Sequence, residues 1–371
     1  MSSSVFFKKA KDHFVKGLPF VIYRLPNIDE YRGFFQKNSD LFKSTSFEES
    51  GFIFAPYKLT EGAVLFPSDH CEQLQHSENL QSTFPVNNSF ISNEQQKESY
   101  LSLISDAIKE ITKTNLEKVV LSRCLNSSIA TNDPINTFKS LASKYPNAFV
   151  YCWFHPEVGN WIGATPENLF KVEGNRFSTM SLAGTKESTP TETIPWTNKE
   201  LEEQKIVTEY LCDQLKDVVS DLTVSEVSDI KAGDLIHLLS KITGKINTTE
   251  LSTIIERLHP TPAVCGQPKQ LAEDFINRKE GYDREYYTGF LGELNLVQKT
   301  SRSRNTRNIE NSVYSSIRRS TNLFVNLRCA QLFEHEIKIY VGGGITKDSI
   351  PEKEWRETVN KSKTIGTVIA F

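Results

Sequence analysis

Residues 149–182 read FVYCWFHPEVGNWIGATPENLFKVEGNRFSTMSL, in which short apolar runs are divided by polar turns. The runs predict strands at Phe149–Phe154, Asn160–Ala164, Leu169–Val172 and Arg176–Leu182. Their connections are only a few residues long, as at Glu173–Asn175, and such short connections favour antiparallel pairing. This stretch therefore predicts an antiparallel sheet.

The rest of the chain extends this pattern and adds helices. Further strands are predicted at Lys118–Arg123, Leu323–Cys329 and Ile337–Val341, and helices at Gln96–Thr112, Lys199–Val219 and Pro351–Ile365. Ser349 with Glu352 three residues later is the pattern of a capping box for the last helix. The fold class is therefore α/β in the α+β sense, with large antiparallel sheets and helices packed outside them.

The 371 residues, 38% hydrophobic and 24% charged, have the composition of a soluble globular protein, which excludes a disordered or fibrous class. The formal net charge of −3 gives no reason to expect nucleic acid or an anionic membrane as a partner. No apolar run approaches the roughly 18 residues of a membrane span, and Met1–Ala10 lacks the apolar core of a signal peptide. We therefore expect a cytoplasmic protein whose six single cysteines are reduced thiols.

Two predicted helices carry glutamates that could bind a metal ion. Glu203 precedes Ile206 and Val207 by three and four residues, so it leans toward the apolar face of its helix. Glu357 lies four residues before Lys361, and this pair could equally be a surface salt bridge. Mg²⁺ binds one or two carboxylates and takes its other ligands from water and substrate, so the two glutamates would suit it if they converge.

Other polar residues allow both a functional and an ordinary interpretation. Lys118 opens an apolar strand, where a lysine is often an edge charge that prevents sheet pairing. Glu167 follows a strand and could be an ordinary loop residue. Gly342–Gly344 could present backbone NH groups to an anion or only form a turn, and Arg328 could bind a carboxylate in a bidentate way.

Taken together, several stretches resemble the chorismate-utilising enzymes, and among them most closely the isochorismate synthases. The resemblance covers about Leu101–Ile365. It is carried by Lys118–Arg123 (KVVLSR), Gly163–Glu167 (GATPE), Leu182–Thr185 (LAGT), Lys199–Glu203, His259–Gly266 (HPTPAVCG), Phe324–Ala330, Gly342–Ile345 and Glu354–Thr358 (EWRET). It implies the chorismate-binding fold as a single domain over residues 1–371, with a variable part at 1–100 and the catalytic core at 101–366.

A few positions separate the branches of this family. Branches that use ammonia carry glutamine or another non-basic residue where this chain has Lys118, and a base suits water as the nucleophile. The aminodeoxychorismate branch forms a covalent adduct through a lysine where this chain has Ala183. Ammonia users also tend to carry a Gly-Thr pair in place of Pro262 and Ala263.

The resemblance implies a role for each matched residue. Lys118 would be the general base for the attacking water and Glu167 the general acid for the leaving C4 hydroxyl, so Lys118 needs a lowered pKa and Glu167 a raised one. Glu203 and Glu357 would bind Mg²⁺. The residues expected to contact chorismate are Gly184, Ala263, Arg328, Gly344 and Lys361.

Three alternatives stay open. A salicylate synthase of the same family also keeps the lysine and goes on to eliminate pyruvate. A non-catalytic binding protein could keep the fold, although charges in a buried pocket would then have no use. A nucleic-acid role through the basic segment 299–320 is disfavoured by its lack of stacking aromatics. The sequence separates neither menaquinone from siderophore biosynthesis nor a monomer from an oligomer.

Overall fold

The computed structural model describes residues 3–78, 80, 94–130, 132–187, 196–232, 235–246, 251–300 and 316–369. Two large sheets dominate it, and every strand pair within the described residues is antiparallel. Most of the basic segment 299–320, namely residues 301–315, lies outside the described residues. The predicted fold class is confirmed.

The first sheet has nine strands. In spatial order they are β15 (Gly266–Gln267), β7 (Lys118–Ser128), β19 (Glu336–Ile345), β18 (Cys329–Leu332), β9 (Gly159–Thr165), β8 (Phe149–His155), β1 (Phe20–Arg24), β2 (Glu30–Gln36) and β6 (Cys71–Ser77).

The second sheet has ten strands, nine of them in one spatial order. They are β12 (Val219–Val224), β14 (Leu235–Ile246), β11 (Arg176–Glu187), β10 (Asn168–Glu173), β17 (Ser316–Val325), β16 (Phe290–Thr300), β4 (Gly51–Ala55), β5 (Ala63–Pro67) and β3 (Phe42–Ser44), with β13 (Ser228–Ala232) also paired to β14. The N-terminal strands β1 to β6 are divided between the two sheets.

An aromatic core joins the two sheets. Phe54 of β4 contacts Trp153 of β8 with ring centroids 5.0 Å apart, and Phe149 of β8 stacks on Phe324 of β17 at 4.3 Å. Large buried rings of this kind supply much of the apolar area that stabilises a fold. The two sheets therefore share a core.

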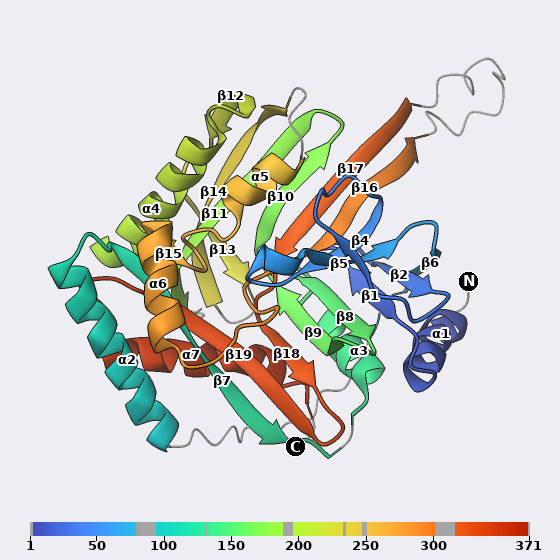
Figure 1. The fold of residues 1–371 in the computed structure, drawn as a ribbon, viewed down its shortest axis with the longest axis horizontal. Coiled ribbons are helices and arrows are strands. Elements are labelled where there is room, and N and C mark those ends of the chain that lie inside the picture. The colour runs from blue at the N-terminus through green and yellow to red at the C-terminus, as the bar shows by residue number, and fades with distance from the viewer. Residues whose placement is uncertain are drawn as a thin grey trace.

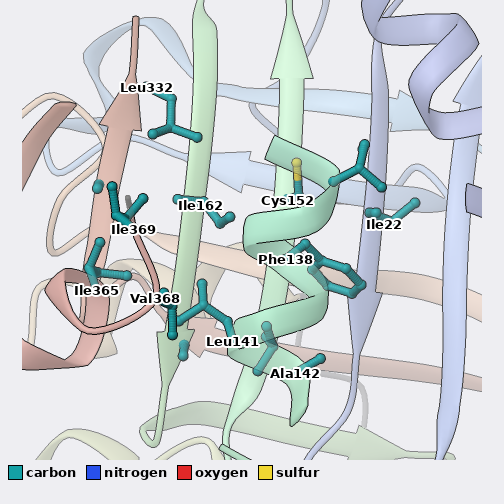
Figure 2. Packing of buried hydrophobic residues seen from close by; sticks show 14 of the residues in the cluster. Ile22, Phe138, Leu141, Ala142, Cys152, Ile162, Leu332, Ile365, Val368 and Ile369 are labelled. Carbon is teal, nitrogen blue, oxygen red and sulfur yellow. The ribbon is translucent and has the colours of Figure 1, made fainter. Parts of the chain in front are cut away.

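Helices cover the outer faces of the sheets (Figure 1). They are α1 (Ser3–Val15), α2 (Glu94–Lys113), α3 (Pro134–Lys144), α4 (Asn198–Leu215), α5 (Leu251–Leu258), α6 (Lys269–Lys279) and α7 (Pro351–Gly366), besides a 3₁₀ turn at Leu59–Glu61. Figure 2 shows Phe138 and Leu141 of α3 packed on the first sheet near Cys152 and Ile162. Within the described part of the chain, no helix is long and apolar enough to cross a membrane.

Two predicted elements and one predicted helix cap are wrong. The predicted strand Leu323–Cys329 is two strands in different sheets, because β17 ends at Val325 and β18 begins at Cys329. The predicted helix Lys199–Val219 ends at Leu215, and Val219 begins β12. Ser349 does not cap α7: its hydroxyl accepts a hydrogen bond from the Thr346 NH, and Ile350 occupies the N-cap position.

Candidate active site

Lys118 lies at the start of β7 with its side chain 2% exposed. Val119 and Leu121 pack under the helices, whereas Lys118 and Val120 line a cavity on the other side of the strand. The alternation of side chains along a strand explains this division. The interpretation of Lys118 as an exposed edge charge is therefore wrong.

Glu203 is the ion-pair partner of Lys118. Its helix α4 starts with a capping box between Thr197 and Glu200, which places Glu203 one turn further along, where it is 8% exposed. The Glu203 Oε1 atom lies 3.1 Å from Lys118 Nζ. A Cβ atom on Gly344 would lie 2.1 Å from the same oxygen, so only glycine allows this approach.

Glu357 and Lys361 come to the cavity from α7. Glu357 Oε1 and Lys361 Nζ are 2.6 Å apart, and Lys361 also donates a hydrogen bond of 2.8 Å to the carbonyl of Gly342. Their side chains are 25% and 16% exposed and line the cavity, so the pair is real but is not a surface salt bridge. Lys361 thereby connects α7 to the glycine-rich end of β19.

Glu167 occupies the turn between β9 and β10. Its NH donates to the Thr165 hydroxyl at 3.3 Å and its carbonyl accepts from the Val325 NH, so the backbone of the turn is fixed. The residue is 6% exposed, and burial raises the pKa of its carboxyl to about 7, against the opposing effect of three cations. Those cations are Lys118, Lys361 and Arg328.

Arg328 lies where the chain crosses from β17 in the second sheet to β18 in the first. Its φ of +50° is in the left-handed region, which non-glycine residues rarely adopt. Burial lowers the pKa of its guanidinium, and Nη1 lies 3.5 Å from the Thr364 hydroxyl of α7, a long contact for a hydrogen bond. Such a group is suited to an incoming carboxylate.

Gly184 lies in β11 with a φ of +72°, at a point where the pairing with β14 shifts register. His237 Nδ1 donates to the Gly184 carbonyl at 2.9 Å. Burial and the nearby Arg328 and Lys361 lower the pKa of His237 to about 3, so its ring is neutral near pH 7. His237 thus fixes the position of Gly184 without adding charge.

All the predicted site residues line one cavity. They are Lys118, Glu167, Gly184, Glu203, Ala263, Arg328, Gly344, Glu357 and Lys361. The convergence that spacing alone could not establish is therefore present. The individual roles of these residues remain predictions.

Family profiles match most of the chain. Residues 61–300 match a profile described as chorismate binding enzyme, and residues 313–367 match a second profile with the same description. The chain belongs to the chorismate-binding enzyme family. The cavity lies within this matched region.

Individual members of the family are similar to the chain. Isochorismate synthase MenF of Escherichia coli is 28% identical over 284 residues, which cover 74% of this chain and 60% of MenF. Isochorismate synthase EntC of Escherichia coli is 28% identical over 289 residues, covering 74% of this chain and 68% of EntC. A solved structure of DhbC from Bacillus anthracis superposes with a TM-score of 0.76 at 23% identity, covering 97% of this chain and 98% of DhbC.

The chemistry of the donor set fits the Mg²⁺ ion expected for this family. Glu203 and Glu357 are carboxylates from separate helices, both turned toward the glycine-rich end of β19: Cβ atoms on Gly344 and Gly343 would lie 2.1 and 3.5 Å from their respective Oε1 atoms. In the described part of the chain no group of three or more His, Cys, Asp and Glu residues is placed to hold a metal. Mg²⁺ needs only one or two protein carboxylates, so these two would suffice.

The sequence did not predict two residues that bind the backbone of the cavity walls, Arg284 and Glu280. Arg284 is 2% exposed and donates to the Val120 carbonyl at 2.7 Å and to the Val264 carbonyl at 2.9 Å, which joins two walls of the cavity. Glu280 pairs with Arg284 and accepts from the Ser122 NH at 2.6 Å. The spacing of Glu280 and Arg284 predicts only that the two can pair, because the backbone groups that they bind belong to other segments of the chain.

His237 was also missed. It lies inside the apolar run of β14, and this position of a histidine was the one feature of the sequence that could have indicated a role in the site.

Proposed function

We propose that this chain is an isochorismate synthase, an isomerase that converts chorismate to isochorismate with Mg²⁺. One observation carries the proposal: a lysine and a carboxyl group with a pKa of about 7, Lys118 and Glu167, face the same buried cavity. The reaction needs a group that takes a proton from water and another that gives a proton to the leaving hydroxyl. The names of the similar MenF and EntC enzymes support the same activity.

Lys118 and Glu167 would divide the proton transfers between them. As the water oxygen bonds to C2, Lys118 takes its proton, the ring double bonds shift, and the C4 hydroxyl leaves with a proton from Glu167. Each such group typically contributes a factor on the order of 10²–10⁴. A pKa of about 7 lets Glu167 hold that proton at neutral pH.

The other cavity residues would hold the substrate. Arg328 would bind the enolpyruvyl carboxylate, aided by the backbone of Gly344, while Gly184, Ala263 and Lys361 shape the rest of the cavity. Mg²⁺ bound by Glu203 and Glu357 would hold the ring carboxylate and withdraw electron density from the ring. The Glu203 carboxylate cannot bind a metal ion fully and also pair with the Lys118 ammonium. The Lys118–Glu203 ion pair and the action of Lys118 as a base would therefore belong to different states of the site.

The test is a product assay. The protein is incubated with chorismate and Mg²⁺, and the products are resolved by chromatography. We expect isochorismate with little pyruvate. Salicylate with an equal amount of pyruvate would identify a salicylate synthase instead, and no consumption of chorismate would refute the proposal.

A further inference from the structure

A second cavity, here called the outer chamber, is also lined by Arg328. It encloses about 360 Å³ and is lined by Asn27, Lys144, Tyr145, Pro146, Asn147, Ala148, Ala164, Pro166, Leu182, Ile230, Arg328 and Thr364. Pro166, Leu182 and Arg328 also line the cavity that contains Lys118 and Glu167. The two cavities therefore share a wall, and Arg328 is its charged member.

The burial of the lining residues changes along the chamber. Asn27, Asn147 and Ile230 are exposed to solvent. Ala164 and Leu182 are only 3% and 7% exposed. The chamber therefore runs from the surface of the molecule inward to the wall that holds Arg328.

Backbone hydrogen bonds fix the outer rim. Arg24 is 3% exposed and donates to the carbonyl of Ala142 at 2.7 Å and to that of Tyr145 at 2.5 Å. The Asn27 NH donates to the Pro146 carbonyl at 2.9 Å. These bonds join the Tyr145–Pro146 segment to the residues around Arg24 and Asn27.

The charged side chains that line the chamber are all positive. Among the described residues that line it, the charged side chains are Lys144 and Arg328, and none is acidic. Lys144 donates to the Thr367 hydroxyl at 2.6 Å, which keeps the lysine at the chamber. Walls of low polarity with cations of one sign attract anions and raise the rate at which they arrive.

We propose that the outer chamber is the passage through which the dianionic substrate reaches the reaction cavity, with Arg328 as its first carboxylate contact at the inner end. The inference rests on the proposed function, since chorismate carries two carboxylates. The mainly apolar walls offer few groups that would retain an anion, whereas Arg328 offers a partly buried guanidinium. The passage thus delivers the substrate carboxylate to the group expected to bind it.

The experiment blocks the rim. Asn147→Cys is labelled either with bulky fluorescein maleimide or with the small reagent methyl methanethiosulfonate. The matched control is Asn277→Cys on the exposed side of α6, and labelled wild type accounts for the native cysteines. We expect the bulky label on Asn147→Cys to lower kcat/KM about tenfold or more, because it obstructs the association of chorismate. The small label on Asn147→Cys and the bulky label on Asn277→Cys should leave kcat/KM near its unlabelled value. The Tm should be the same in all of these proteins.

A bulky label at Asn147→Cys that leaves kcat/KM unchanged overturns the proposal. Turnover by the unlabelled variant tests the proposed function separately. If that variant converts no chorismate, the association rate of chorismate with the immobilised protein is the readout instead. A bulky label that slows association supports the passage, and an unchanged association rate refutes it.

Discussion

Glu167 and Glu203 are both buried and lie in two walls of the same cavity. They have the same side chain but different surroundings. Glu203, from helix α4, is paired with Lys118 at 3.1 Å. Glu167, from the turn after β9, has no ion pair among the residues that the structure describes, and burial raises the pKa of its carboxyl to about 7. Desolvation favours the neutral form of a carboxyl group, and a close cation opposes it, so the two glutamates differ in whether a cation is paired with them.

Lys118 acts on both glutamates, because it pairs with Glu203 and is also the cation that most strongly opposes the raised pKa of Glu167. Lys118→Gln removes the proposed base and keeps a polar side chain of similar length. We expect turnover to fall by about 10²–10⁴-fold, with little change in chorismate affinity, since the base acts mainly in the transition state.

Steady-state kinetics and calorimetric titration with chorismate measure the two quantities. Near-normal turnover would eliminate Lys118 as the base. Amination of chorismate by the variant in ammonium buffer would strengthen the argument from the family branches.

The Glu167 wall is tested by Glu167→Gln, which keeps the shape but removes the transferable proton. We expect turnover to fall about 10²-fold or more, with chorismate and Mg²⁺ still bound. In the wild type, kcat/KM should fall as pH rises through about 7, because the acid then ionises in the free enzyme. Wild-type turnover by the variant would mean that another group protonates the leaving hydroxyl.

The same substitution should change stability with a definite pH dependence. A folded pKa of about 7, above the ordinary value of 4.5, means that the native state holds the proton more tightly. The stability associated with Glu167 is then fully present below pH 4.5 and is lost as pH rises through 7.

Glu167→Gln avoids that loss, so its advantage over the wild type in free energy of unfolding should grow to at most about 3 kcal/mol by roughly pH 8. Urea unfolding of the metal-free protein at pH 4.5 and 8 measures it. An advantage that is the same at both pH values would contradict the raised pKa.

The Glu203 wall is tested through the metal. EDTA should abolish activity and Mg²⁺ restore it, and Glu203→Ala or Glu357→Ala should each raise the Mg²⁺ concentration for half-maximal activity by about tenfold or more. Glu202→Ala, an exposed neighbour on α4, is the matched control and should leave it unchanged. The assignment of ligands fails if both variants keep the wild-type Mg²⁺ requirement.

Local patterns predicted many of the elements correctly. The strand at Lys118–Arg123 and the helix at Gln96–Thr112 are present as β7 and α2, but β7 continues to Ser128, well beyond the predicted end. The inward lean of Glu203 is confirmed, because the periodicity of a helix records which face is buried. The prediction of a single strand at Leu323–Cys329 was wrong, because an apolar run does not show that the chain leaves one sheet and enters another.

The sequence by itself determined the mixed α/β class, several of its strands and helices, and the residues that resemble a chorismate site. These follow from apolar periodicity and short motifs, which act over a few neighbouring residues. Only the tertiary structure decided that Lys118 pairs with Glu203 and that burial raises the pKa of Glu167. Such properties depend on distances and burial between segments far apart in the chain, and a local pattern carries no information about either.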